Sequence, residues 1–147
     1  MLNDREIEYN VAAGRIISEN YSRDSLTPNG YDIRIGDHEL DIIKTNSLFF
    51  ISSLEKFNMP DNIVASLHIK SKYARRGVFA SFGFVDAGFI GNLTMAFYNF
   101  GEEFRIKRGM KFVQIVFYEI KTPEKNYPGR SGNYQNSEGI NVKSPED

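Results

Sequence analysis

One carboxylate near the middle of the chain stands where a catalytic side chain would be displayed. Asp86 lies within Gly83–Asn92, between two runs rich in β-forming residues, Val78–Val85 and Leu93–Phe100. Glycines in the intervening stretch give the backbone the freedom to turn. The pattern predicts a β-hairpin in which Asp86 is either an ordinary turn residue or a group that activates water.

A cationic segment comes shortly before this hairpin. Lys70–Gly77 contains four cationic side chains within eight residues, together with the hydroxyl of Ser71. Because the formal net charge of the whole chain is only −1, this positive charge is local and suits a small anion rather than bulk nucleic acid or a membrane surface. A carboxylate close to such a segment indicates chemistry on a polyanion.

The composition favours one domain over residues 1–147, because no linker or repeat divides the chain. The sequence contains no cysteine, which excludes disulfides and thiolate metal sites and is compatible with a reducing cytoplasm. Zinc-dependent nucleoside deaminases need cysteine ligands, so that class is excluded. The two histidines, His38 and His68, favour surface or structural roles. With no signal peptide or long apolar run, we expect a cytoplasmic protein.

One helix is predicted, within residues 1–14. Asn3 and Glu6 have the spacing of a capping box, Ile7 begins the apolar face, and Gly14 is placed to end the helix.

The rest of the ordered chain is predicted to be all-β. The pattern gives at least six strands, at Tyr31–Ile35, Ser47–Ile51, Ile63–Ile69, Val78–Val85, Leu93–Phe100 and Lys111–Ile120. Many short strands separated by turn residues are typical of a β-sandwich or a distorted barrel. Leu93–Phe100 and Lys111–Ile120 are apolar on both faces, so we expect burial on both sides, in a sandwich centre or against another subunit.

The last residues, 122–147, have a different composition. Pro, Gly, Ser, Asn and charged residues dominate there, and the aromatic side chains are Tyr127 and Tyr134. This composition predicts a flexible C-terminal tail, which is either simply disordered or a mobile lid over a bound ligand.

Five segments, taken in order, resemble the dUTPase and dCTP deaminase superfamily of trimeric β-proteins, which hydrolyse dUTP to dUMP or deaminate dCTP. The segments are Asn29–Asp37, Lys70–Gly77, Gly83–Asn92, Arg108–Phe117 and Gly132–Gly139, and they span most of the chain. The resemblance implies a distorted jelly-roll-like β-sandwich or barrel with a short N-terminal helix and a flexible tail. It also implies a homotrimer.

The resemblance assigns roles to individual residues. Asp86 would position the water that attacks the α-phosphate of dUTP, and Phe89 would pack on the deoxyribose. The other residues expected to bind substrate are Lys70, Ser71, Lys72, Arg75, Gly83, Val85, Asn92, Gln114, Arg130, Tyr134 and Gln135. Mg²⁺ is the expected cofactor, carried by the triphosphate without direct protein ligands and with Asp32 in its outer coordination sphere.

Ala96 distinguishes the two reactions of the superfamily. The metal-free dCTP deaminases resemble the strand Leu93–Asn99 but carry a proton-transferring Glu where this chain has Ala96. The start of the chain, Arg75 and the tail sequence after Asn133 nevertheless look more like the deaminase branch. The sequence therefore favours a dUTP diphosphatase of the deaminase branch. The alternatives are a dCTP deaminase, a bifunctional enzyme, or a nucleotide-binding protein without catalysis.

Overall fold

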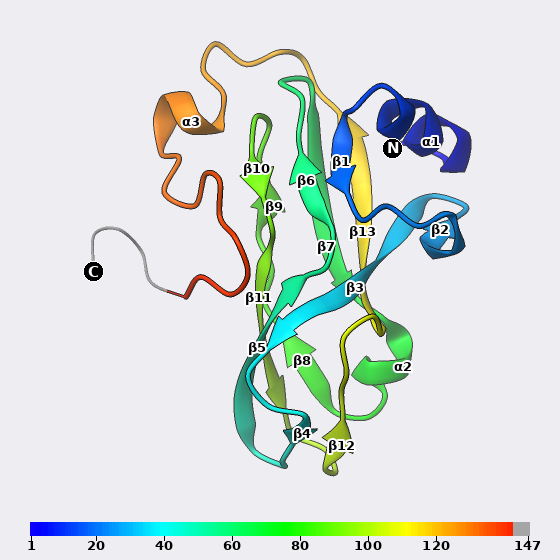
Figure 1. The fold of residues 1–147 in the computed structure, drawn as a ribbon, viewed down its shortest axis with the longest axis vertical. Coiled ribbons are helices and arrows are strands. Elements are labelled where there is room, and N and C mark those ends of the chain that lie inside the picture. The colour runs from blue at the N-terminus through cyan, green and yellow to red at the C-terminus, as the bar shows by residue number, and fades with distance from the viewer. Residues whose placement is uncertain (143–147) are drawn as a thin grey trace.

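The computed structural model describes residues 1–142, and a curled antiparallel sheet of eight strands forms most of it (Figure 1). Seven of its strands follow the spatial order β8 (Val78–Ala80), β11 (Thr94–Asn99), β5 (Ser47–Ser53), β3 (Gly30–His38), β13 (Lys111–Glu119), β7 (Ile63–Ile69) and β9 (Phe84–Val85), with β2 (Leu26–Thr27) beside β3. Two smaller sheets join β1 (Ile16–Glu19), β6 (Lys56–Asn58) and β10 (Ile90–Gly91), and β12 (Phe104–Arg105) with β4 (Ile42–Ile43). The helical elements are α1 (Asp4–Ala12), η1 (Arg23–Ser25), α2 (Ser71–Ala74) and α3 (Tyr127–Arg130). The predicted all-β class with an N-terminal helix is confirmed.

Helix α1 begins with the capping box that its sequence predicts. The Asn3 side chain accepts from the Glu6 backbone N–H at 2.9 Å, and the Glu6 carboxylate accepts from the Asn3 N–H at 2.9 Å. Ile7 is fully buried, and Leu2 donates its backbone N–H to Phe117 of β13 at 2.9 Å. The helix is therefore fixed against the main sheet.

An aromatic cluster at one end of the core anchors α2. Tyr73 is buried, and its ring centroid lies 4.1 Å from that of Phe112. Phe112 in turn packs edge-on against Phe97 and Phe49, with centroid distances of 5.0 and 6.2 Å. This packing holds the short helix in place while the side chains of its other face, including Ser71, stay exposed.

Two strand predictions need correction. Residues Val78–Val85 do not form one strand: β8 ends at Ala80, and β9 pairs with β7 at the opposite end of the strand order. Ser81 and Gly83 lie in the connection, where the chain leaves one edge of the sheet and crosses to the other.

The second correction concerns Leu93–Phe100, which is not buried on both faces by the residues that the structure describes. Burial alternates along β11, with Met95 and Phe97 inside and Ala96 and Tyr98 half-buried. Phe100 is 60% exposed. The outward face of this strand is half-buried, so the described residues cover it only in part.

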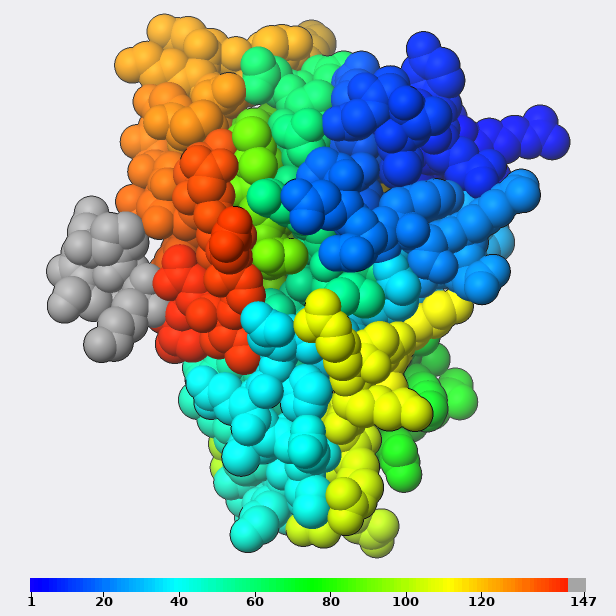
Figure 2. All heavy atoms as spheres, viewed as in Figure 1, coloured from blue at the N-terminus to red at the C-terminus, as the bar shows by residue number. Residues whose placement is uncertain are grey.

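The C-terminal segment runs back along the fold. Residues 122–142, coloured orange to red, lie beside β10 and β11 in the ribbon and in the space-filling view (Figures 1 and 2). Residues 143–147 of the predicted lid lie outside the described part of the chain. Within residues 1–142, no helix has the length and apolar character needed to cross a membrane.

Candidate active site

Backbone hydrogen bonds within the turn and to Met59 fix the turn that carries Asp86. Its closing hydrogen bond runs from the Phe89 N–H to the Asp86 carbonyl at 3.2 Å, and Met59 donates to the Phe89 carbonyl at 2.8 Å. Gly88 has a φ of +89°, which a residue with a side chain rarely adopts. Ala87 and Phe89 are buried, whereas Asp86 is exposed. The turn thus presents the carboxylate to solvent from a rigid support.

Asp86 lines a cavity of about 520 Å³ between the hairpin, the outer face of β11 and the C-terminal segment. The body of the fold supplies Phe50, Phe84, Val85, Asp86, Phe89, Asn92, Leu93, Thr94 and Ala96, and the C-terminal segment supplies Tyr127, Ser131, Asn133, Tyr134, Ser137, Asn141 and Val142. Among these described residues Asp86 is the only charged side chain. The cavity is therefore an apolar and amide-lined space with one carboxylate.

A second, smaller cavity of about 250 Å³ also reaches Asp86. Two cationic side chains, Lys125 and Arg130, line it, and the segment at Tyr127 and Ser131 belongs to both cavities. Arg130 is thus close to Asp86 but outside the larger cavity.

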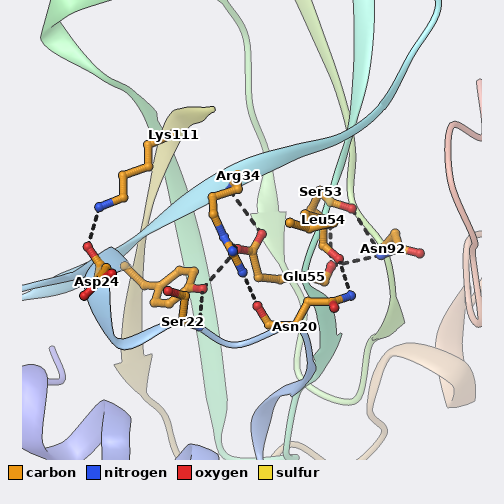
Figure 3. Close-up of polar contacts among 10 residues, drawn as sticks. Asn20, Ser22, Asp24, Arg34, Ser53, Leu54, Glu55, Asn92 and Lys111 are labelled. Atoms are coloured by element: carbon orange, nitrogen blue, oxygen red, sulfur yellow. Dashed lines mark hydrogen bonds and ion pairs between the residues drawn. The ribbon is translucent and has the colours of Figure 1, made fainter. Parts of the chain in front are cut away.

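Asn92 is oriented by a polar network behind the cavity (Figure 3). Its Nδ2 donates to the carbonyls of Ser53 and Glu55 at 3.2 and 2.9 Å, and its Oδ1 accepts from the Gly139 backbone N–H at 3.3 Å. The Glu55 carboxylate is fully buried and accepts from Arg34 Nε at 2.8 Å and from the Tyr31 hydroxyl at 3.0 Å. Burial, together with the charge of Glu55, raises the pKa of Tyr31 to about 12.

The predicted phosphate-binding residues lie elsewhere in the same chain. Ala65 of β7 pairs with Val85, and Lys70 follows Ala65 by five residues, directly after the end of β7, which places it roughly 16 Å further along at about 3.3 Å per residue. Figure 1 accordingly shows α2 at the opposite end of the fold from β10 and α3.

Around Lys70 the structure brings together a separate polar group. The Lys70 ammonium forms an ion pair with Asp32, and Gln114 is the cross-strand neighbour of both Asp32 and His68. Gln114 donates to the Thr27 hydroxyl at 2.9 Å.

The predicted site residues thus fall into groups. Val85, Phe89, Asn92 and Tyr134 surround Asp86 in the larger cavity, and Arg130 lines the smaller one. Two others do not line the larger cavity: Gly83 is exposed beside it, and the amide of Gln135 is bonded to the hairpin backbone. The residues that a single chain keeps apart from Asp86 are Lys70, Ser71, Lys72, Arg75 and Gln114.

Sequence reasoning missed several cavity residues of the C-terminal segment, notably Tyr127 and Ser137. The Tyr127 ring meets Phe89 edge-on at 5.7 Å, and Ser137 is buried. A signal for order was present, because Asn126 caps α3 by accepting from the Gly129 N–H and Pro128 stands in its first turn.

Comparison with known proteins places the chain among nucleotide enzymes. A protein-family profile described as dCTP deaminase-like matches residues 37–120. A dCTP deaminase of Pyrococcus horikoshii is 38% identical over 136 residues, covering 83% of this chain and 86% of the relative. A probable deoxyuridine 5'-triphosphate nucleotidohydrolase of Sulfolobus islandicus rod-shaped virus 1 is 27% identical and covers 97% of both chains.

Solved structures share the fold. The 2'-deoxycytidine 5'-triphosphate deaminase of Agrobacterium tumefaciens matches 82% of this chain with a TM-score of 0.70 at 18% identity, and this chain spans about half, 48%, of that protein. The dUTPase of Staphylococcus bacteriophage 80alpha, solved with dUPNHPP, matches with a TM-score of 0.57 at 21% identity, over 76% of this chain and 79% of its own. At such identities the likeness shows the fold alone.

Proposed function

Because the chain belongs to the dCTP deaminase-like family, within the dUTPase and dCTP deaminase superfamily, we propose that it hydrolyses dUTP to dUMP and pyrophosphate. The matched relatives carry the names of two nucleotide reactions, deamination and hydrolysis. The choice between these reactions rests on the residues of the cavity.

The observation that carries the proposal is the lack of a proton-transferring side chain in the cavity wall around Ala96. Ala96 and its cross-strand partner Phe50 both line the cavity, and Asp86 is the only charged side chain among the described residues that do so. Deamination needs a group that delivers protons to the ring nitrogen and the leaving amine, and neither Ala96 nor Phe50 can do this. One carboxylate is sufficient to activate water for attack on phosphorus.

In the proposed reaction Asp86 accepts a proton from a water molecule as the water oxygen forms a bond to the α-phosphorus. The bond between that phosphorus and the oxygen bridging to the β-phosphorus breaks, and pyrophosphate leaves with the electron pair. Asp86 stands on a turn closed by its own hydrogen bond, so the carboxylate is held in position for this attack.

Magnesium would travel on the triphosphate and neutralise its charge, since Mg²⁺ keeps its waters and prefers substrate oxygens. The residues that the structure describes contain no cluster of three or more His, Cys, Asp or Glu side chains that could hold a metal ion. Asp32 fits the outer-sphere role, because its Oδ1 is buried and has no hydrogen-bond partner within residues 1–142. It could accept from a water bound to the ion.

A second copy of the chain would supply the cations for the phosphates. Lys70, Ser71, Arg75 and Gln114 line neither cavity at Asp86, and the described residues cover the outward face of β11 only in part. In the homotrimer that the resemblance implies, the basic segment of one subunit would face Asp86 of the next. The proposed partners are therefore dUTP and two further copies of this chain.

A second candidate function is dCTP deamination, alone or combined with dUTP hydrolysis. The names of the relatives favour it, because the dCTP deaminases of Pyrococcus and Thermococcus are 35–38% identical to this chain. A nucleotide-binding protein without catalysis is the third candidate.

One incubation separates the three candidates. The protein is mixed with dUTP or with dCTP in the presence of Mg²⁺, and the products are resolved by chromatography. We expect dUMP and pyrophosphate from dUTP, and no dUTP or dUMP from dCTP. Conversion of dCTP would favour the deaminase, and unchanged nucleotides in both incubations would favour the binding protein.

A further inference from the structure

The side-chain amide of Gln135 bridges the two sides of the catalytic turn. Its Oε1 accepts from the Ile90 N–H at 3.0 Å, and its Nε2 donates to the Gly88 carbonyl at 3.0 Å. These backbone groups flank Phe89 and follow Asp86 by two and four residues. One amide therefore closes the outer side of the turn, opposite the bond from Met59 to the Phe89 carbonyl.

The residues after Gln135 extend this contact through backbone hydrogen bonds and one isolated β-bridge. β10 pairs with β6 on one side, and on its other side Asn136 donates to the Ile90 carbonyl at 2.7 Å. Asn92 then donates to the Ser137 carbonyl at 2.8 Å, and Gly91 and Ser137 form a parallel bridge. The backbone N–H and carbonyl of Ile90 thus both find partners in the C-terminal segment.

The hairpin sequence leaves room for this segment. A Cβ placed on Gly91, which has a φ of +145°, would lie 2.7 Å from the Ser137 carbonyl oxygen. A Cβ on Gly88 would lie 2.9 Å from the Asn126 Cβ. Both distances are too short for non-bonded atoms, so only glycine at these positions permits the observed packing.

We propose that Gln135 is a positioning residue, which fixes the turn that carries Asp86 and does not contact the nucleotide. Both polar atoms of its amide are bonded to the hairpin, and Gln135 lines neither of the two cavities at Asp86. Without Gln135 the Gly88 carbonyl and the Ile90 N–H would pass to water, and the outer side of the turn would keep only the backbone bonds from Tyr127 to the Ala87 carbonyl and from Asn136 to the Ile90 carbonyl.

The C-terminal segment would then contribute to catalysis by ordering Asp86 before substrate arrives, in addition to covering it. The catalytic part of this inference rests on the proposed function. The structural part does not.

The structural part is tested by amide hydrogen exchange on the nucleotide-free protein. In Gln135→Met, which keeps the length of the side chain but removes both hydrogen bonds, we expect the Ile90 amide to exchange at least about fivefold faster, as loss of one hydrogen bond allows. Gln135→Glu keeps an acceptor for Ile90, so that amide should stay near its wild-type rate. Glu138→Gln is the matched control, because Glu138 is exposed and lines neither cavity at Asp86. Unchanged Ile90 exchange in Gln135→Met would overturn the proposal.

The catalytic part is tested by steady-state kinetics with dUTP. We expect Gln135→Met to lower kcat about tenfold, with KM altered less than twofold. A raised KM with unchanged kcat would show that Gln135 binds the nucleotide and would contradict the positioning role. If the wild-type protein does not turn over dUTP, the proposed function fails, while the exchange experiment still decides whether Gln135 holds the turn.

Discussion

At the scale of single residues, the chemistry proposed for this protein depends on the contrast between Asp86 and the groups that surround it. The carboxylate is exposed, yet the next three residues of its turn are buried, and the last two of them are bonded to the backbone of Met59, directly after β6. Such a support keeps a short side chain in one place without burying its charge, which would cost free energy. The same residue can then act as a base toward water.

Replacing Asp86 by Asn tests this role. We expect Asp86→Asn to fold and bind nucleotide normally, because the Asp86 carbonyl still closes the turn, but to lose roughly 10²-fold or more in turnover. Turnover is measured with dUTP, and binding by calorimetry with a non-hydrolysable analogue. A near-normal rate would leave Asp86 with a role in the turn only.

Tyr31 predicts a loss of stability at alkaline pH. Its pKa is about 12 in the folded chain and 10.0 when unfolded, so the unfolded chain releases the proton first as pH rises. The protonated Tyr31 hydroxyl therefore contributes fully to the free energy of unfolding below about pH 10, and this contribution is lost as the pH rises toward 12. Urea melts between pH 9 and 12 should show this decline, and Tyr31→Phe should flatten it. An equally steep decline in Tyr31→Phe would assign the effect to other groups.

At the scale of elements, the C-terminal segment differs most from the structure that its composition predicts. Its composition predicts a flexible tail, but residues 126–142 make backbone bonds to the hairpin through Ala87, Ile90 and Asn92. Only Ser137 is buried among residues 122–142, so the segment adds little to the core. Whether it moves during turnover stays a prediction.

Truncation after Lys125 tests the role of this segment. The melting temperature should fall by less than about 5 °C, because few apolar groups leave the core. Turnover should fall strongly, since the cavity loses its outer wall and β10 loses the partners of Ile90. Full activity in the truncated protein would show that the segment has no part in catalysis.

The full-length variant Tyr134→Ala refines this test. Tyr134 lines the larger cavity, and loss of an aromatic face against a base costs about 1–3 kcal/mol elsewhere. We therefore expect Tyr134→Ala to be more active than the truncated protein but less active than wild type. An activity equal to wild type would remove Tyr134 from the site.

Single elements also show which parts of the fold the sequence predicts. Strict alternation predicted β7 at its observed bounds, and the Asn3 and Glu6 spacing predicted the cap of α1. The crossing between β8 and β9 was not predictable, because it depends on how the sheet curls rather than on the local pattern of Val78–Val85. For the same reason, the residues near Asp86 could be named, but the separation of Ser71 from it needed the three-dimensional structure.

At the scale of the whole molecule, the site proposed here is incomplete in one chain. The larger cavity at Asp86 contains no cation among the described residues that line it, and the basic segment Lys70–Gly77 lines neither cavity there. We expect light scattering to give a mass about three times the chain mass of 16.8 kDa. The outer face of β11, which is half-buried within one chain, would then be covered further by a neighbour.

Mixing two inactive variants tests whether the site is shared between copies. Asp86→Asn and Ser71→Ala should each be nearly inactive, and subunit exchange between them should restore part of the activity. The recovery is expected because some sites then combine an intact Asp86 with an intact Ser71 from another copy. A mixture of two Asp86→Asn preparations is the control. Failure to recover despite proven subunit exchange, or a fully active monomer, would contradict a shared site.

The most direct test of dUTP hydrolysis at the α-phosphate uses water labelled with ¹⁸O. The protein is incubated with dUTP and Mg²⁺ in this water, and dUMP and pyrophosphate are separated and weighed by mass spectrometry. We predict one ¹⁸O atom in dUMP and none in pyrophosphate, because the attacking water bonds to the α-phosphorus. Label in pyrophosphate, release of orthophosphate, or no turnover of dUTP would contradict the proposed reaction.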